Sequence, residues 1–84
     1  MEVWEIVGIE KNAKFKADDG TVVSGVRLHL SGDPEAGSDL TGKQVRNQFI
    51  SNNALKKFDL VPAVGQTIIF HFNRYGNISN VEVL

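Results

Sequence analysis

In the segment KFKADDGTVVSG, residues 14–25, Phe15 stands between Lys14 and Lys16, next to a polar turn. A lysine can neutralise a phosphate, and an exposed aromatic ring can stack on any base for about 1 to 3 kcal/mol. Alternatively, Phe15 packs across a hairpin against Val22 or Val23. The first interpretation predicts an exposed ring for a flat anionic ligand, and the second predicts a buried ring.

Further side chains that could contact phosphates or bases lie on the strands predicted after this hairpin. In TVVSGVRLHLS and KQVRNQFIS, basic and polar residues occupy every second position, opposite the apolar ones. The turn NRYGN, residues 73–77, adds an arginine and a tyrosine. The predicted nucleic-acid-binding residues are therefore Lys14, Phe15, Lys16, Arg27, His29, Arg46, Gln48, Arg74 and Tyr75.

Several of these residues also have a purely structural interpretation. Arg27 and Arg46 could pair with Glu5 or Glu10 across neighbouring strands, because opposite charges on facing positions stabilise a sheet. Tyr75 could close one end of a barrel. The residue pattern alone leaves these alternatives open.

Catalytic chemistry is not indicated by the sequence. The two histidines, His29 and His71, lack the spacing of metal ligands, and the motifs of zinc proteases, nucleotide-binding loops and nucleophile elbows are missing. Ser24 and Ser51 have no evident partner that would activate them. The sequence contains no cysteine, which excludes disulfides, thiolate metal sites and thiol catalysis. We expect no enzyme activity, no catalytic residue, no metal, no cofactor and no small-molecule substrate.

The charge balance argues against tight binding to a polyanion. The chain contains nine Lys and Arg residues and ten Asp and Glu residues, which gives a formal net charge of −1. Residues 32–42 contain three acids and no base, which leaves nine bases and seven acids in the rest of the chain. We therefore expect weak binding at physiological salt, or binding assisted by a homodimer that doubles the site.

No stretch approaches the roughly 18 to 20 apolar residues that a membrane-spanning helix needs, and no basic start precedes a long apolar run. We expect no membrane association and a cytoplasmic location.

Alternation of apolar and polar residues predicts five strands. They cover residues 3–17, 21–31, 43–51, 67–75 and 78–84, and a short helix over 52–58 follows Ser51 or Asn52 as its cap. The first strand far exceeds the usual length of about 5 to 6 residues. It is predicted to bend at Gly8 or at the step from Lys11 to Asn12.

Five strands and one short helix in 84 residues fit an all-β fold, a five-stranded Greek-key barrel of the OB type, in the order β-β-β-α-β-β. Closing the barrel would also remove exposed strand edges. An SH3-like barrel, with a shorter first hairpin, is the alternative. We predict one domain over residues 1–84. In OB barrels the face of the second and third strands, flanked by the first hairpin and the last turn, binds oligonucleotides.

Two stretches, DDGTVVSGVRLHL and VGQTIIFHFNRYGNISNVEVL, give the layout a resemblance to a known family. The chain resembles the small OB-fold single-stranded DNA-binding proteins of phages and Gram-positive mobile elements, which are similar to the filamentous-phage helix-destabilising proteins. The resemblance implies a DNA-binding wing at the first hairpin, a homodimer formed through a sheet surface, and a role in replication or DNA transfer. It places Lys14, Phe15 and Lys16 on the wing, Arg27 and Arg46 in the groove, and Arg74 and Tyr75 on its rim.

Two functional hypotheses follow. The first is a protein that binds single-stranded DNA, or RNA, without sequence preference. The second is a small barrel-shaped protein-protein interaction module or adaptor subunit that binds a peptide through its groove or an exposed strand.

Overall fold

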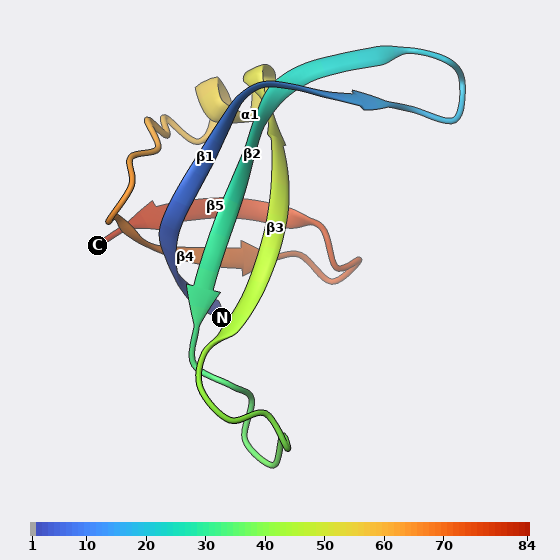
Figure 1. Ribbon diagram of the computed structural model, residues 1–84. Coiled ribbons are helices and arrows are strands. Elements are labelled where there is room, and N and C mark those ends of the chain that lie inside the picture. Colours follow the sequence, from blue (N-terminus) through green and yellow to red (C-terminus); the bar gives the residue numbers. More distant parts are fainter. Residues whose placement is uncertain (1) are drawn as a thin grey trace.

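The computed structural model describes residues 2–84 and shows five strands and one short helix (Figure 1). The predicted order along the chain is confirmed: β1 (Glu2–Lys16), β2 (Val22–Gly32), β3 (Gln44–Ser51), α1 (Asn52–Lys57), β4 (Thr67–Phe72) and β5 (Ile78–Val83). All neighbouring strands are antiparallel, and they form one sheet in the order β3-β2-β1-β4-β5. None of the described helices is long and apolar enough to cross a membrane.

The predicted closure of the sheet into a barrel is wrong. The strand order has two ends, and β3 and β5 form no pairing with each other in the part of the chain that the structure describes. The sheet curls, so that β4 and β5 cross behind the other three strands (Figure 1). Phe58 and Phe72 line the space between the two end strands and pack against the core. The groove of about 400 Å³ that they line stays open between these two strands.

The predicted bends of the long first strand are confirmed. The register of β1 against β2 shifts between Ile6 and Gly8 and again between Glu10 and Ala13, where Asn12 has a φ of 59°. Such bulges bend a strand and increase its twist. The first part of β1 pairs with β4 as well as β2, whereas the part after the bulges pairs with β2 alone. The bends therefore let one strand join the two halves of the curled sheet.

The core lies between the two halves of the sheet. Phe70, Ile6, Leu28, Leu30 and Ile68 are the largest fully buried side chains. Each contributes about 1.5 to 3 kcal/mol by leaving water. The alternation of apolar residues along β2 predicted this inward face, and the burial of Leu28 and Leu30 confirms it. Along β4 three consecutive residues, 68–70, are buried, so burial does not alternate there.

The β1–β2 hairpin extends beyond the core as a projecting ribbon (Figure 1). Its turn is closed by backbone hydrogen bonds from Ala17 N to Thr21 O and from Gly20 N to Ala17 O. The side chain of Asp19 accepts a hydrogen bond from Thr21 N, which lowers the pKa of that carboxyl. Gly20 has a φ of 88°, a conformation that glycine adopts without steric cost. The predicted polar turn is therefore confirmed.

Helix α1 begins after Ser51, whose hydroxyl accepts a hydrogen bond of 3.1 Å from Ala54 N. This resolves the two possible caps in favour of Ser51. The helix has only six residues and fixes the position of Phe58 directly after it.

Candidate nucleic-acid interface

The register between β2 and β3 divides the predicted site residues between two faces of the sheet. Arg27 pairs with Phe49, so these residues share the outer face, and His29 follows on the same face. Arg46 and Gln48 instead pair with buried leucines of β2 and share the inner face. The prediction that all four polar side chains lie on one face is therefore wrong. Segment 44–49 has polar residues at both parities, so its alternation could not determine the face.

The ring of Phe15 lies on the outer surface and not in the core. It is 53% exposed, and it faces the ring of Phe49, with centroids 5.8 Å apart and planes tilted by 31°. In the register, Phe15 pairs with Val23 and Phe49 pairs with Arg27. Gly25 lies between Val23 and Arg27 on β2, and a Cβ atom there would meet the backbone of Ile50 and Ser51. We call Phe15 and Phe49 the aromatic pair.

Phe49 was missed as a site residue because the alternation grouped it with Val45 on the apolar side of the strand and placed Arg46 and Gln48 on the ligand-binding side. Only Ile50 is buried, whereas Phe49 is half-buried on the outer face. The pairing of Phe49 with Arg27 could have identified it, but that pairing depends on the register.

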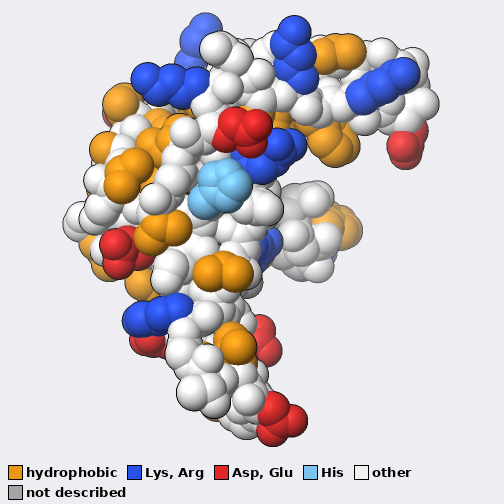
Figure 2. Space-filling view, viewed as in Figure 1, with side chains coloured by type: hydrophobic (Ala, Val, Ile, Leu, Met, Phe, Trp, Pro, Cys, Tyr) orange, Lys and Arg blue, Asp and Glu red, His pale blue; other side chains and the backbone are white. Residues whose placement is uncertain are grey.

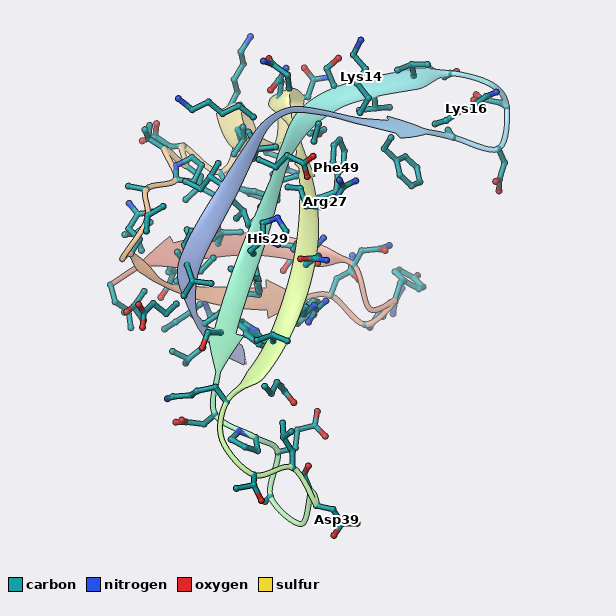
Figure 3. All side chains as sticks on the ribbon, viewed as in Figure 1. Lys14, Lys16, Arg27, His29, Asp39 and Phe49 are labelled. Carbon is teal, nitrogen blue, oxygen red and sulfur yellow. The ribbon has the colours of Figure 1, made fainter. Side chains whose placement is uncertain are left out.

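Arg27 lies beside Phe49 of the aromatic pair (Figure 3). It forms an ion pair with Glu10 of β1. Its Nη1 donates a hydrogen bond of 3.0 Å to Glu10 Oε2. The structural interpretation of Arg27 as a partner of Glu10 is thus confirmed. A guanidinium carries five N–H donors, so it can bind a phosphate while it keeps a carboxylate partner. Exposed ion pairs of this kind contribute little to stability.

His29 continues the outer face next to Arg27 (Figure 3). It pairs with Gly8 of β1, and a Cβ atom at Gly8 would lie 3.4 Å from His29 Cβ. The glycine therefore leaves room for the imidazole to lean across β1, where it is exposed to solvent.

Lys14 and Lys16 lie along the projecting hairpin and are exposed (Figure 3). Successive side chains of a strand point to opposite faces, so both lysines lie on the opposite face of the hairpin from Phe15. They share that face with their register partners Ser24 and Val22. A single DNA strand that stacks on Phe15 would therefore have to pass around the narrow two-stranded hairpin to contact the lysines.

Arg74 and Tyr75 lie in the turn between β4 and β5. Asn73 Oδ1 accepts hydrogen bonds from Tyr75 N and Asn77 N, which organises the turn. The Arg74 guanidinium lies 5.0 Å from the Tyr75 ring centroid and donates a hydrogen bond of 2.8 Å to the Tyr75 hydroxyl. Tyr75 is 73% exposed, so it does not close a barrel end.

Arg46 and Gln48 meet on the inner face, where Arg46 Nη2 donates a hydrogen bond of 3.2 Å to Gln48 Oε1. The Arg46 guanidinium also lies 5.8 Å from the ring centroid of the buried Trp4. Neither residue is in the core, since both are half-buried at the free edge of the sheet.

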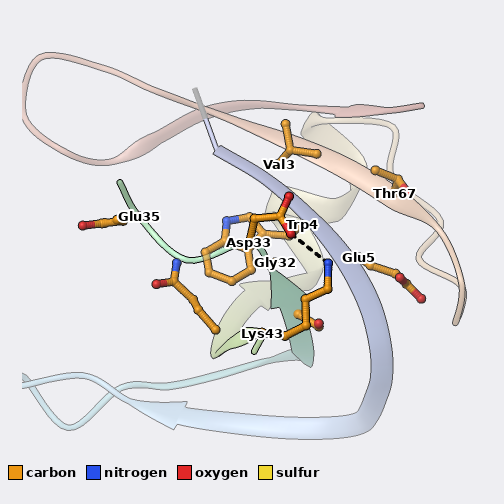
Figure 4. A pocket seen from close by; sticks show the side chains of 10 residues that line it. Val3, Trp4, Glu5, Gly32, Asp33, Glu35, Lys43 and Thr67 are labelled. Carbon is orange, nitrogen blue, oxygen red and sulfur yellow. Dashed lines mark hydrogen bonds and ion pairs between the residues drawn. The ribbon is translucent and has the colours of Figure 1, made fainter. Parts of the chain in front are cut away.

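The far end of the molecule is acidic. Figure 4 shows a pocket beside Trp4, where Lys43 Nζ donates a hydrogen bond of 2.8 Å to Asp33 Oδ1. That hydrogen bond and the charge of Lys43 lower the pKa of Asp33, and the same contact raises the pKa of Lys43. Glu5 and Glu35 also line this pocket.

Lysine and arginine side chains gather at the opposite end, around the hairpin, which ends in an acidic tip (Figure 2). This charge distribution favours a polyanion at the hairpin end over the loop end.

Within residues 2–84, no group of three or more His, Asp or Glu side chains is arranged to hold a metal ion. No protein-family model matches the sequence, and no similar curated protein or solved structure was found.

Proposed function

We propose that this protein binds single-stranded DNA without strong sequence preference, through the outer face of β2 and β3 and the projecting hairpin. The observation that carries the proposal is the aromatic pair: two partly exposed rings lie together beside Arg27, on a face reached from solvent. Aromatic rings stack on every base, and a neighbouring cation binds the phosphate that joins two bases. RNA offers the same bases and phosphates and is a second possible ligand.

The arrangement of strands supports this proposal. We propose that the fold is a partly open Greek-key barrel of the OB type, because β1 pairs with both β2 and β4, β2 pairs with β3, and β4 pairs with β5. OB barrels bind oligonucleotides on the second and third strands, between the first hairpin and the turn of the last two strands. Here those positions hold the aromatic pair and the turn with Arg74 and Tyr75.

The charges indicate weak binding that depends on salt. The cations at the hairpin end and the last turn are Lys14, Lys16, Arg27 and Arg74, whereas the net charge of the chain is −1. In a plot of the logarithm of affinity against the logarithm of salt concentration, the slope is about −0.7 for each phosphate that is neutralised on a single strand. A homodimer would double this surface and raise the apparent affinity. We propose replication or DNA transfer of a phage or mobile element as the biological setting.

Fluorescence anisotropy of a labelled dT oligonucleotide of about 12 nucleotides, within the range covered by one OB fold, tests the proposal. We expect binding at low salt that weakens as salt rises, and weaker binding to a duplex of the same length. An oligonucleotide that does not bind at low salt, or binding unchanged by salt, would overturn the proposal.

The free edges of the sheet favour one alternative, a module that binds a peptide. In the described sheet, β3 and β5 each have one neighbouring strand, so each presents backbone donors and acceptors that an extended peptide could pair with. Because such binding depends on backbone hydrogen bonds, it would be insensitive to salt.

A further inference from the structure

The open side of the curled sheet forms a groove between β3 and the β4–β5 hairpin. Its volume is about 400 Å³, within the range of roughly 300 to 1,000 Å³ that is typical of small-molecule sites. We call it the seam groove. Among the residues that line it are Gln48, Phe49, Phe58, Phe72, Asn77 and Ile78.

The chemistry of the seam groove suits a nucleobase. Phe58 and Phe72 offer apolar rings, and Gln48 and Asn77 offer amides. Gln48 Oε1 accepts a hydrogen bond from Arg46 and its Nε2 donates one to Phe49 O, which leaves one N–H and one lone pair of this amide for the polar edge of a base. Arg46 adds a cation at the rim. None of the described residues that line the groove is an aspartate or glutamate, so the lining carries no charge that repels a phosphate.

A second cation lies near the same groove. Lys57 Nζ lies 5.8 Å from the ring centroid of Phe58, which lines the groove. The charges near the seam groove are therefore complementary to an anionic strand, in contrast to the acidic pocket beside Trp4 at the far end.

The seam groove is continuous with the outer face. Phe49 lines the groove and also contacts Phe15 in the aromatic pair. β3 is the end strand of the sheet, so no further strand separates its outer face from its inner face at this edge. A single DNA strand that stacks on Phe49 can therefore pass over the edge of β3 and reach Gln48 on the inner face.

We propose that the seam groove is a second nucleotide subsite, so that one bound strand crosses the free edge of β3 from the aromatic pair into the groove. This inference depends on the proposed binding of single-stranded DNA and extends it. It gives Arg46 and Gln48 a binding role on the face where the register places them.

The test compares two dT oligonucleotides, of about 4 and about 12 nucleotides, both within the site sizes of OB folds. Gln48→Glu places a carboxylate in the groove. Gln44→Glu is its matched control, because it makes the same change on the inner face of β3. Gln44 lies at the opposite end of this strand from the seam groove and lines the acidic pocket. Melting temperatures verify that both variants fold. Asn77→Asp, in the exposed turn on the opposite wall, replaces Gln48→Glu if that variant does not fold.

We expect Gln48→Glu to weaken binding of the longer oligonucleotide by at least about fivefold, while Gln44→Glu changes it little and the shorter oligonucleotide binds all forms alike. Equal effects of the two variants on the longer oligonucleotide would overturn the seam subsite and leave the proposed function intact. The seam subsite would also be overturned if Gln48→Glu weakened the binding of both oligonucleotide lengths equally. If neither oligonucleotide binds the unaltered protein, the proposed function itself fails, and the subsite fails with it.

Discussion

The rings of Phe15 and Phe49 meet with centroids 5.8 Å apart although β2 separates their strands in the sheet. Phe15 pairs with Val23 and Phe49 pairs with Arg27, so the contact runs diagonally across β2. It joins the turn end of the projecting hairpin to the edge strand β3. The result is a partly exposed aromatic surface with Arg27 at its side.

Gly25→Ala should destabilise the fold. A Cβ atom at this position would lie 2.7 Å from Ser51 Cα and 2.9 Å from the carbonyl carbon of Ile50, both of which are backbone atoms that cannot rotate away. Overpacking of this kind costs roughly 1 to 3 kcal/mol. Chemical denaturation measures the loss of stability, and Ser24→Ala at the exposed neighbouring position is the control. Equal stability of the two variants would show that β2 and β3 do not approach closely at Gly25.

Glu10→Gln should strengthen binding to single-stranded DNA. In the free protein the Glu10 carboxylate accepts a hydrogen bond from Arg27 and offsets its charge, so it competes with a phosphate. We expect tighter binding and a steeper salt dependence, measured by anisotropy at several salt concentrations. Glu82→Gln is the control, because it also removes one negative charge, but from a carboxylate that lies 3.3 Å from His71 Nε2 on the other half of the sheet. If both variants bind alike, only the net charge matters.

Lys14→Gln combined with Lys16→Gln should reduce the salt slope of binding. Both lysines are exposed on the hairpin, so their replacement should leave the melting temperature nearly unchanged. The slope should become shallower by about 0.7 for each phosphate that the hairpin no longer neutralises. Lys43→Gln combined with Lys56→Gln removes the same charge elsewhere and should change the slope less. A slope unaltered by the hairpin substitutions would exclude the hairpin from binding phosphates.

Asp33 should titrate at a lower pH than an ordinary aspartate. The hydrogen bond from Lys43 lowers its pKa in the folded protein, so this contact stabilises the fold above the pKa of the unfolded chain. That stabilisation disappears as the pH falls through the folded pKa. Carbon NMR of the side-chain carboxyls measures the titration. Lys43→Gln should return the pKa of Asp33 to the ordinary range and leave Asp19, lowered by Thr21, unchanged. An ordinary pKa for Asp33 in the unaltered protein would contradict the contact.

The sequence predicted the local elements well because they depend on local patterns. The pattern in residues 21–31 and 67–75 identified β2 and β4, and in β2 the alternation also identified the buried face. The polar turn around Gly20 and the bends of β1 followed from backbone preferences of single residues.

Long-range features could not be predicted in the same way. The inner position of Arg46 depends on the register of β3, whose polar residues occur at both parities. The open seam lies between two end strands that are distant in the sequence, and Phe58 and Phe72 line it from segments outside β3 and β5. The contact of Phe15 with Phe49 depends on the register of both strands against β2, so it could not be inferred from the lysines around Phe15.

Binding of the dT oligonucleotide to Phe15→Ala tests the role of the aromatic pair most directly. Phe15 is 53% exposed, so the melting temperature should change little. The loss of one stacked base corresponds to about 1 to 3 kcal/mol, so the dissociation constant should rise by roughly 5- to 150-fold. Val22→Ala, at a position on the same hairpin that is 57% exposed on the opposite face, should leave the dissociation constant unchanged. An unchanged dissociation constant for Phe15→Ala would show that the ring does not stack on bases, and would contradict the account.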